Sequence, residues 1–297
     1  MFASNRPSQS IRRSALGVEL VLVPAWEQFD WLWHGFSTRR GGVSRAYLPA
    51  NSSASGQQGD LNLGFTEADD RGAVVENRER FVEALSGNGE TPLILVRQIH
   101  SNCSLTAPDV PFAQDAIPAA DGLMTDGAGT LIGVQTADCI PVLVVDPAHR
   151  AVAAFHAGWR GTVERIVELG VARMGAEFGS DPARLLAAIG PGIGACCYTV
   201  GDEVRALFGA NFRYAGDLFT DGGEVGASGA AERQPSGMRL DLIEANRRQL
   251  LDAGLAVEAI AVVGGCTSCQ PELFFSHRAS GGHAGRMIAA IGVRAES

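Results

Sequence analysis

The sequence has few charged and few aromatic residues, and its net charge has the wrong sign for holding nucleic acid. Charged residues make up 19% of the 297 residues and aromatic residues 7%, whereas 46% are hydrophobic. The formal net charge is −9, and proteins that hold a phosphate backbone do so with an excess of Lys and Arg. The composition is that of an ordinary globular protein without a nucleic-acid partner.

The sequence also lacks a run of about 18 apolar residues, the length that a membrane span needs. Arg12 and Arg13 precede an apolar stretch, as in a secretory signal, but Glu19 interrupts that stretch. The six cysteines do not resemble a secreted disulfide framework in a chain of this length. We therefore expect a cytoplasmic protein with no membrane partner, in which residues 1–16 form a loose tail and residues 17–297 a single domain.

Two nucleotide-binding motifs are missing: no GxGxxG follows the first predicted strand, and no GxxxxGK[ST] occurs. Short apolar runs alternate with segments of helical spacing, which predicts a mixed α/β fold. The gaps between the runs 131–135, 140–145 and 151–155 are too short for a crossover helix, so we expect this section to be antiparallel. Strands are predicted at 19–24, 93–97, 131–135, 140–145, 151–155, 185–189, 257–263 and 286–293, and helices at about 67–85, 160–178, 201–208 and 240–253.

Three residues that can bind a metal each lie at the end of an apolar strand: His100, Cys139 and His156. Two imidazoles and a thiolate match the preference of zinc for nitrogen and sulfur, and three protein ligands leave a fourth position open, as in catalytic zinc sites. The alternative is that each is a buried residue with a satisfied hydrogen bond, because their separations show no compact ligand spacing.

Two arginines are candidates for binding an anion. Arg160 lies in AGWRGTVERIVELG, which predicts a helix that starts directly after the strand of His156, and a helix start favours an anion or a thiolate at Cys139. Arg39 lies in HGFSTRRGGVS, beside a Gly-Gly turn, where it would clamp a substrate or phosphate. The alternatives are a solvent-exposed helix start for Arg160 and a hairpin turn with surface arginines for Arg39.

The remaining thiols allow two interpretations. Cys196 and Cys197 follow a Gly- and Pro-rich turn, and CTSC at 266–269 matches a CxxC pattern. A CxxC favours redox or metal chemistry, but without a second pair a purely structural role stays open. Asp138, next to Cys139, is a candidate general acid by position, or a carboxylate that caps a turn.

Six motifs follow one another along the chain: RQIH (97–100), ADGLMTD (120–126), GVQTADCIPVLVVD (133–146), AVAAFHAGWRGT (151–162), IGPGIGACCY (189–198) and FFSHR with GRM (274–287). Together they resemble the YfiH family, also called the laccase-domain or multicopper polyphenol oxidase family. The resemblance runs from about residue 17 to 293. It implies a four-layer α/β/β/α sandwich with mixed, largely antiparallel sheets, similar to the cysteine-hydrolase core of cytotoxic necrotizing factor toxins.

The resemblance implies a zinc-dependent purine nucleoside phosphorylase acting on adenosine, guanosine, inosine and methylthioadenosine, with adenosine deamination as a second activity. It carries the family's metal site onto His100, Cys139 and His156, which we also expect to be catalytic. The partners would be purine nucleosides and phosphate, and the chain a monomer or weak homodimer. The substrate-binding residues that we expect are Arg39, Gln98, Asp138, Arg160 and Tyr198.

Three positions depart from the family pattern, and they bear on substrate preference rather than on the metal ligands. Ser101 stands where a Gly is usual, Thr199 where an acidic residue is common, and Ala279 where a second Arg often follows FFSHR.

Two other functions compete with the phosphorylase. A multicopper laccase needs about ten histidines, including His-X-His pairs, whereas this chain has six histidines and no such pair, so copper is expected only as an adventitious occupant of a zinc site. A cysteine hydrolase would use Cys139 as nucleophile and His156 or His100 as base on an amide, as in relatives described as peptidoglycan editing factors. Metal dependence separates this hydrolase from the phosphorylase.

Overall fold

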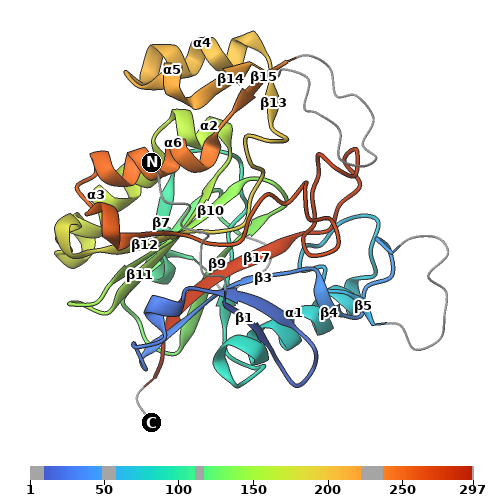
Figure 1. Cartoon of the computed structure of the whole chain (residues 1–297). Helices are drawn as coiled ribbons and strands as arrows, with labels where there is room; N and C mark the ends of the chain where they lie inside the picture. The colour runs from blue at the N-terminus through green and yellow to red at the C-terminus, as the bar shows by residue number, and fades with distance from the viewer. Residues whose placement is uncertain (1–9, 49–57, 111–116, 222–236, 296–297) are drawn as a thin grey trace.

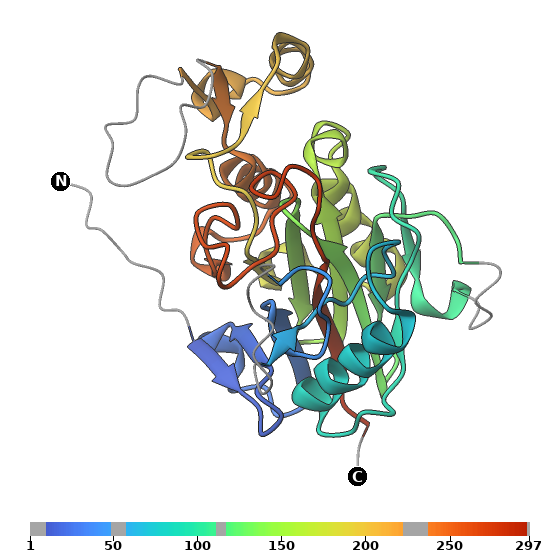
Figure 2. The ribbon, with the colours of Figure 1, turned by 90° about the vertical axis from the view of Figure 1, so that its right-hand side faces the viewer.

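Two large β-sheets stack face to face and carry helices on both outer faces. The computed structural model describes residues 10–48, 58–110, 117–221 and 237–295. Figure 1 shows α3 and α6 over the outer face of one sheet, and Figure 2 shows α1 over the outer face of the other. The α/β/β/α arrangement implied by the family resemblance is confirmed.

The first sheet contains the first and last described strands, and the second contains most strands from the middle of the chain. The first has the order β1 (Ser10–Arg13), β2 (Glu19–Leu22), β3 (Leu32–Ser37), β17 (Met287–Val293), β9 (Thr130–Thr136), β6 (Leu93–Ile94). The second has the order β16 (Ile260–Val262), β12 (Leu186–Ile189), β10 (Ile140–Asp146), β11 (Ala151–Ala157), β8 (Gly122–Thr125), β7 (Ser104–Thr106). A small sheet joins β13 (Thr199–Val200), β15 (Met238–Leu240) and β14 (Phe219–Asp221), and β4 (Arg40–Gly42) pairs with β5 (Gly59–Asp60).

The helices begin and end where the sequence offers capping groups. Asp70 and Asp241 accept hydrogen bonds from the backbone N–H groups three residues on, and so cap α1 and α6. The helix predicted at 160–178 is interrupted at Arg165, whose φ is 63°, so it forms the two helices α2 and α3. The α-helices are α1 (Arg71–Ser86), α2 (Trp159–Val163), α3 (Ile166–Phe178), α4 (Asp202–Asn211), α5 (Ala215–Leu218) and α6 (Leu242–Asp252), and the 3₁₀ turns are Pro24–Trp26, Ala107–Asp109, Pro182–Arg184 and Val257–Ala259.

The central strands are apolar on both faces because both faces are covered. On β10, Val142 and Val144 pack toward α3 and α6, whereas Leu143 and Val145 pack between the two sheets. A third cluster, which includes Phe81 of α1, covers the outer face of the first sheet. This double burial explains why the strands appear in the sequence as continuous Val- and Ile-rich runs instead of alternating patterns.

The prediction that 131–155 forms one antiparallel section is confirmed for β10 and β11 but is wrong for β9. β10 pairs with β11 over its whole length, whereas β9 lies in the first sheet between β17 and β6. The chain crosses from one sheet to the other over residues 137–139. Four Cα–Cα steps of extended chain reach about 13 Å, enough to bridge sheets that stack about 10 Å apart. A gap too short for a helix is therefore still long enough to change sheets.

The N-terminal prediction also needs correction within the described residues. Residues 10–13 of the predicted loose tail form β1, which pairs with β2 from Ser10↔Leu22 to Arg13↔Glu19; residues 1–9 lie outside the described residues. Among the helices that the structure describes, none is long and apolar enough to cross a membrane.

Candidate metal centre

His100, Cys139 and His156 meet at one point, as the sequence predicts. Each offers one ligand atom, and these atoms all lie within 4.8 Å of one another. The Cys139 sulfur is 3.8 Å from Nε2 of His100, and the two imidazole rings lie 4.9 Å apart between centroids. We call these three residues the metal triad.

The fold brings the triad together from three separate segments. Cys139 lies in the 137–139 crossing between the sheets, and His156 lies on β11 opposite Pro141 of β10. His100 lies in the loop after β6 with a left-handed backbone (φ 62°). The triad thus forms where the chain changes sheets, which explains why its members are far apart in sequence.

Asp121 holds two members of the triad in place and was not singled out from the sequence. It is fully buried just before β8, and its Oδ1 accepts a hydrogen bond from Nδ1 of His156 at 2.8 Å. The same carboxylate accepts the backbone N–H groups of residues 99–101 and the Ser101 hydroxyl, at 2.7–3.1 Å. Because Nδ1 of His156 is engaged, Nε2 is left to face Cys139. The only signal in the sequence was its place in the ADGLMTD motif.

Charge in the triad favours a thiolate beside an imidazolium when no ion is bound. Burial alone would raise the pKa of Cys139, but the charge of His156 and hydrogen bonds from both histidines lower it to about 6. Burial alone would lower the pKa of His156, but the Cys139 charge and the hydrogen bond to Asp121 raise it to about 9. Hydrogen bonds from His156 and Ser101 outweigh burial and lower the pKa of Asp121 to about 2.

The triad fits a tetrahedral metal ion. Zn–N and Zn–S bonds of about 2.0 and 2.3 Å place the nitrogen and sulfur ligands about 3.5 Å apart, close to the 3.8 Å between His100 and Cys139. A side chain at Gly158 would intrude, because its Cβ would lie 2.9 Å from both the Cys139 sulfur and Cδ2 of His100. Two imidazoles with one thiolate suit zinc or copper.

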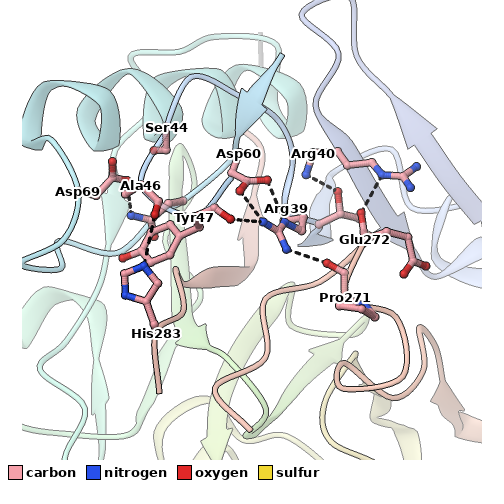
Figure 3. A network of polar contacts seen from close by, with 12 residues as sticks. Arg39, Arg40, Ser44, Ala46, Tyr47, Asp60, Asp69, Pro271, Glu272 and His283 are labelled. Atoms are coloured by element: carbon pink, nitrogen blue, oxygen red, sulfur yellow. Dashed lines mark hydrogen bonds and ion pairs between the residues drawn. The ribbon is translucent and has the colours of Figure 1, made fainter. Parts of the chain in front are cut away.

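Two of the predicted substrate-binding residues bond to the protein itself. The Arg39 guanidinium donates to both carboxylate oxygens of Asp60, at 2.8 and 2.5 Å, and to the carbonyls of Pro271 and Tyr47 (Figure 3). Gln98 exchanges two hydrogen bonds with the backbone of Gln135. These contacts favour a role in tying loops together.

Asp138 supports the loop that carries Cys139. Its backbone is left-handed (φ 96°), and its carboxylate accepts from the Thr267 hydroxyl at 2.6 Å and the Arg278 backbone N–H at 2.7 Å. The Asp138 carbonyl accepts the N–H of Ile193 at 2.7 Å. These contacts favour the interpretation of Asp138 as a carboxylate that holds a turn.

Tyr198 lies close enough to Cys139 and to Arg160 to be influenced by the charge of each. Burial raises the pKa of Tyr198, and the Cys139 charge raises it further, whereas Arg278 and Arg160 act in the opposite direction. Arg160 is exposed, with its guanidinium 4.3 Å above the Trp159 ring. Arg278 lies 5.3 Å from the Tyr198 ring centroid and was missed in the sequence, although it belongs to the FFSHR motif.

The chain is similar to one protein family and to several named proteins. The family model described as multi-copper polyphenol oxidoreductase laccase matches residues 33–294. A Geobacillus stearothermophilus protein named purine nucleoside phosphorylase YlmD is 38% identical over 276 residues, which cover 91% of this chain and 97% of that protein. A protein from an unknown prokaryotic organism, named adenosine deaminase RL5, is 34% identical over 263 residues, or 86% of this chain and 92% of that protein.

The fold also matches that of a solved structure. The crystal structure of the Bacillus licheniformis hypothetical protein YfiH superposes with a TM-score of 0.78 at 32% identity, covering 96% of this chain and 99% of that one. Relatives named as purine nucleoside phosphorylases and an adenosine deaminase indicate that the chain is an enzyme. The chain belongs to the multi-copper polyphenol oxidoreductase laccase family, which is the YfiH family that its motifs resemble.

Proposed function

We propose that the protein is a zinc-dependent purine nucleoside phosphorylase that also deaminates adenosine, with residues 17–297 as its catalytic domain and the metal triad as its centre. The observation that carries the proposal is the meeting of two imidazoles and a thiolate within 4.8 Å. A buried carboxylate behind one imidazole adds the outer support that metal sites use. The names of the relatives add the substrate class.

In the proposed reaction, inorganic phosphate replaces the purine on the ribose. The bond from C1′ to the purine nitrogen breaks, a bond from C1′ to a phosphate oxygen forms, and the base leaves with a proton on its nitrogen. His100, Cys139 and His156 would hold the zinc ion, which would supply Lewis acidity to the reaction. For adenosine, the second activity replaces the C6 amino group with the oxygen of water and releases ammonia.

The protein residues orient these reactants. Asp121 keeps the proton of His156 on Nδ1, so Nε2 stays available as a ligand. Arg160 is the arginine that we propose for the phosphate, because it is exposed and acts electrostatically on Tyr198 beside the triad. Tyr198 is the proposed neighbour of the nucleoside. We expect the enzyme to act in the cytoplasm, where its thiols stay reduced.

A cysteine hydrolase acting on an amide is the second candidate, because the triad also has the geometry of a nucleophile, a base and an orienting acid. Cys139, His156 and Asp121 lie in series, and the pKa of Cys139 is lowered to about 6 by its histidine neighbours against the effect of burial. A thiolate of this kind attacks carbonyl groups without a metal. Chelation therefore distinguishes the two candidates.

The test is to purify the protein without a metal-affinity column, quantify zinc and copper per chain, and follow base release from inosine with and without phosphate. We expect zinc in the triad, phosphate-dependent base release, and inosine formation from adenosine. Chelation and Cys139→Ala should each reduce turnover by more than about 100-fold, since loss of a group behind a ligand already costs 10- to 100-fold.

Cys103→Ala is the matched control, because Cys103 is an exposed thiol outside the triad. It should keep both zinc and turnover. A protein that holds no metal at the triad and shows no purine turnover would contradict the proposal. Amide hydrolysis that survives chelation and is lost in Cys139→Ala would establish the hydrolase instead.

A further inference from the structure

Four cysteines outside the metal triad also gather at one point. Their sulfur atoms all lie within 4.8 Å of one another, and the Cys269 sulfur is 3.4 Å from that of Cys196 and 3.3 Å from that of Cys197. We call this group the four-cysteine cluster; its members are Cys196, Cys197, Cys266 and Cys269.

The fold delivers the four thiols from two neighbouring loops. β12 and β16 are parallel neighbours in the second sheet, so the loops that follow them leave from the same edge. A backbone bridge joins Gly192 to Cys266 across these loops. The CxxC of 266–269 therefore does have a second pair of thiols, which is the adjacent pair Cys196 and Cys197.

The separations suit four thiolates around one ion. A Zn–S bond of about 2.3 Å places the sulfurs of a tetrahedral site about 3.8 Å apart, and the cluster has contacts of 3.3 and 3.4 Å within an outer limit of 4.8 Å. An iron–sulfur cluster does not suit them, because its inorganic core would hold the thiolates farther apart. Four sulfurs this close repel one another as thiolates, and a divalent cation removes that repulsion.

The backbone around the cluster leaves room for the sulfur atoms and directs N–H groups toward one of them. The Cβ of any residue other than glycine at position 194 would lie 3.3 Å from both the Cys196 sulfur and Cβ of Cys266. The backbone N–H groups of Gly194 and Cys269 favour the charged form of the Cys266 thiol. Such N–H donors stabilise a charged sulfur that serves as a metal ligand.

We propose that the four-cysteine cluster binds a second zinc ion in a closed, structural site. Four protein ligands leave no open position, so this ion would stabilise the fold instead of carrying out chemistry. The zinc ion would link the loop that ends at Tyr198 to the loop that carries Thr267. Because the Thr267 hydroxyl donates a hydrogen bond to Asp138, next to Cys139, this link also supports the metal triad.

The test counts zinc in protein purified with a reductant and without a metal-affinity column. We expect two zinc ions in the wild-type chain, one in Cys139→Ala and one in Cys266→Ser/Cys269→Ser. Cobalt substituted into Cys139→Ala should give the intense sulfur-to-cobalt absorption of four thiolates. Cys103→Ser, the matched control, should keep both ions and lose only one freely reactive thiol.

These measurements need no turnover, so they separate this inference from the proposed function. A chain without purine activity that holds two zinc ions would support this inference alone. An active phosphorylase that holds one zinc ion would support the proposed function alone. Cys139→Ala keeps all four thiols, so the result stands even if the double variant does not fold. Cys139→Ala protein that holds no zinc, holds iron, or carries a disulfide within the cluster would overturn the proposal.

Discussion

Replacing Asp121 with Asn should damage both the fold and the metal triad, although the change in shape is small. Each carboxylate oxygen accepts at least two N–H donors: Oδ2 accepts those of Ile99 and Ser101, and Oδ1 accepts those of His100 and His156. An amide offers one oxygen, so two donors must then face its NH₂ group. At about 1–3 kcal/mol for each unsatisfied buried donor, the loss of unfolding free energy is about 2–6 kcal/mol.

The effect on zinc depends on which way the amide turns. If the NH₂ group faces His156, the imidazole can accept a hydrogen bond there only by moving its proton from Nδ1 to Nε2. The lone pair that a metal needs is then lost. If the NH₂ group faces the other way, the loop that carries His100 loses its anchor. Either orientation should weaken zinc binding by about 10- to 100-fold.

The assay for Asp121→Asn combines urea unfolding of the metal-free protein with zinc competition against a chelator. Asp126→Asn is the matched control, because Asp126 is exposed just beyond the opposite end of β8; its stability should stay within about 0.5 kcal/mol of wild type. An Asp121→Asn protein that binds zinc as tightly as wild type and is equally stable would refute the reasoning.

Three further changes test other parts of the structure. Gly158→Ala should lose zinc but stay folded, because its φ of −70° suits alanine while the added Cβ would lie 2.9 Å from the Cys139 sulfur; zinc content and thermal unfolding check this. Burial and a nearby Arg lower the pKa of His34 from 6.5 to about 4. Only the unfolded state therefore binds the proton between these pH values, and stability should fall by about 3 kcal/mol as pH drops from 6.5 to 4; His34→Gln, followed by urea unfolding against pH, should lack this slope. Thr267→Val leaves a nearly buried oxygen of Asp138 without its 2.6 Å donor, so it should cost about 1–3 kcal/mol in urea unfolding, whereas Thr267→Ser should not.

Local patterns predicted most of the central strands and helices, whereas the layers were implied by the family resemblance. Val- and Ile-rich runs predicted the central strands, and Asp and Gly caps agree with the observed helix ends. What the pattern could not determine is which sheet a strand joins. A three-residue gap fits both a hairpin and a crossing between stacked sheets, and only the packing of β9 against β17 selects the crossing.

The metal triad was predicted because its members carry distinctive chemistry within motifs, whereas the residues that support it were missed because they do not. Asp121 became recognisable only when the fold enclosed it among N–H donors. For Arg39 the charge alone indicated a ligand, and no local pattern predicted the ion pair that Arg39 makes with Asp60 in the fold. A charged residue reveals its role through its partners, and those partners are set by tertiary structure.

The 137–139 crossing explains why the chemistry gathers at one place in this fold. A chain that leaves one sheet for another has backbone groups that neither sheet can pair, and here other loops pair with them. The backbone carbonyl of Asp138 accepts a hydrogen bond from an N–H group of the loop after β12. The side-chain carboxylate of Asp138 in turn accepts two hydrogen bonds from the loop after β16. The next residue, Cys139, faces the histidine loop that Asp121 fixes. The segments that carry family motifs are therefore those that meet at the crossing. The loops after β12 and β16 are joined there by the Gly192–Cys266 bridge and by the contacts among the four cysteines.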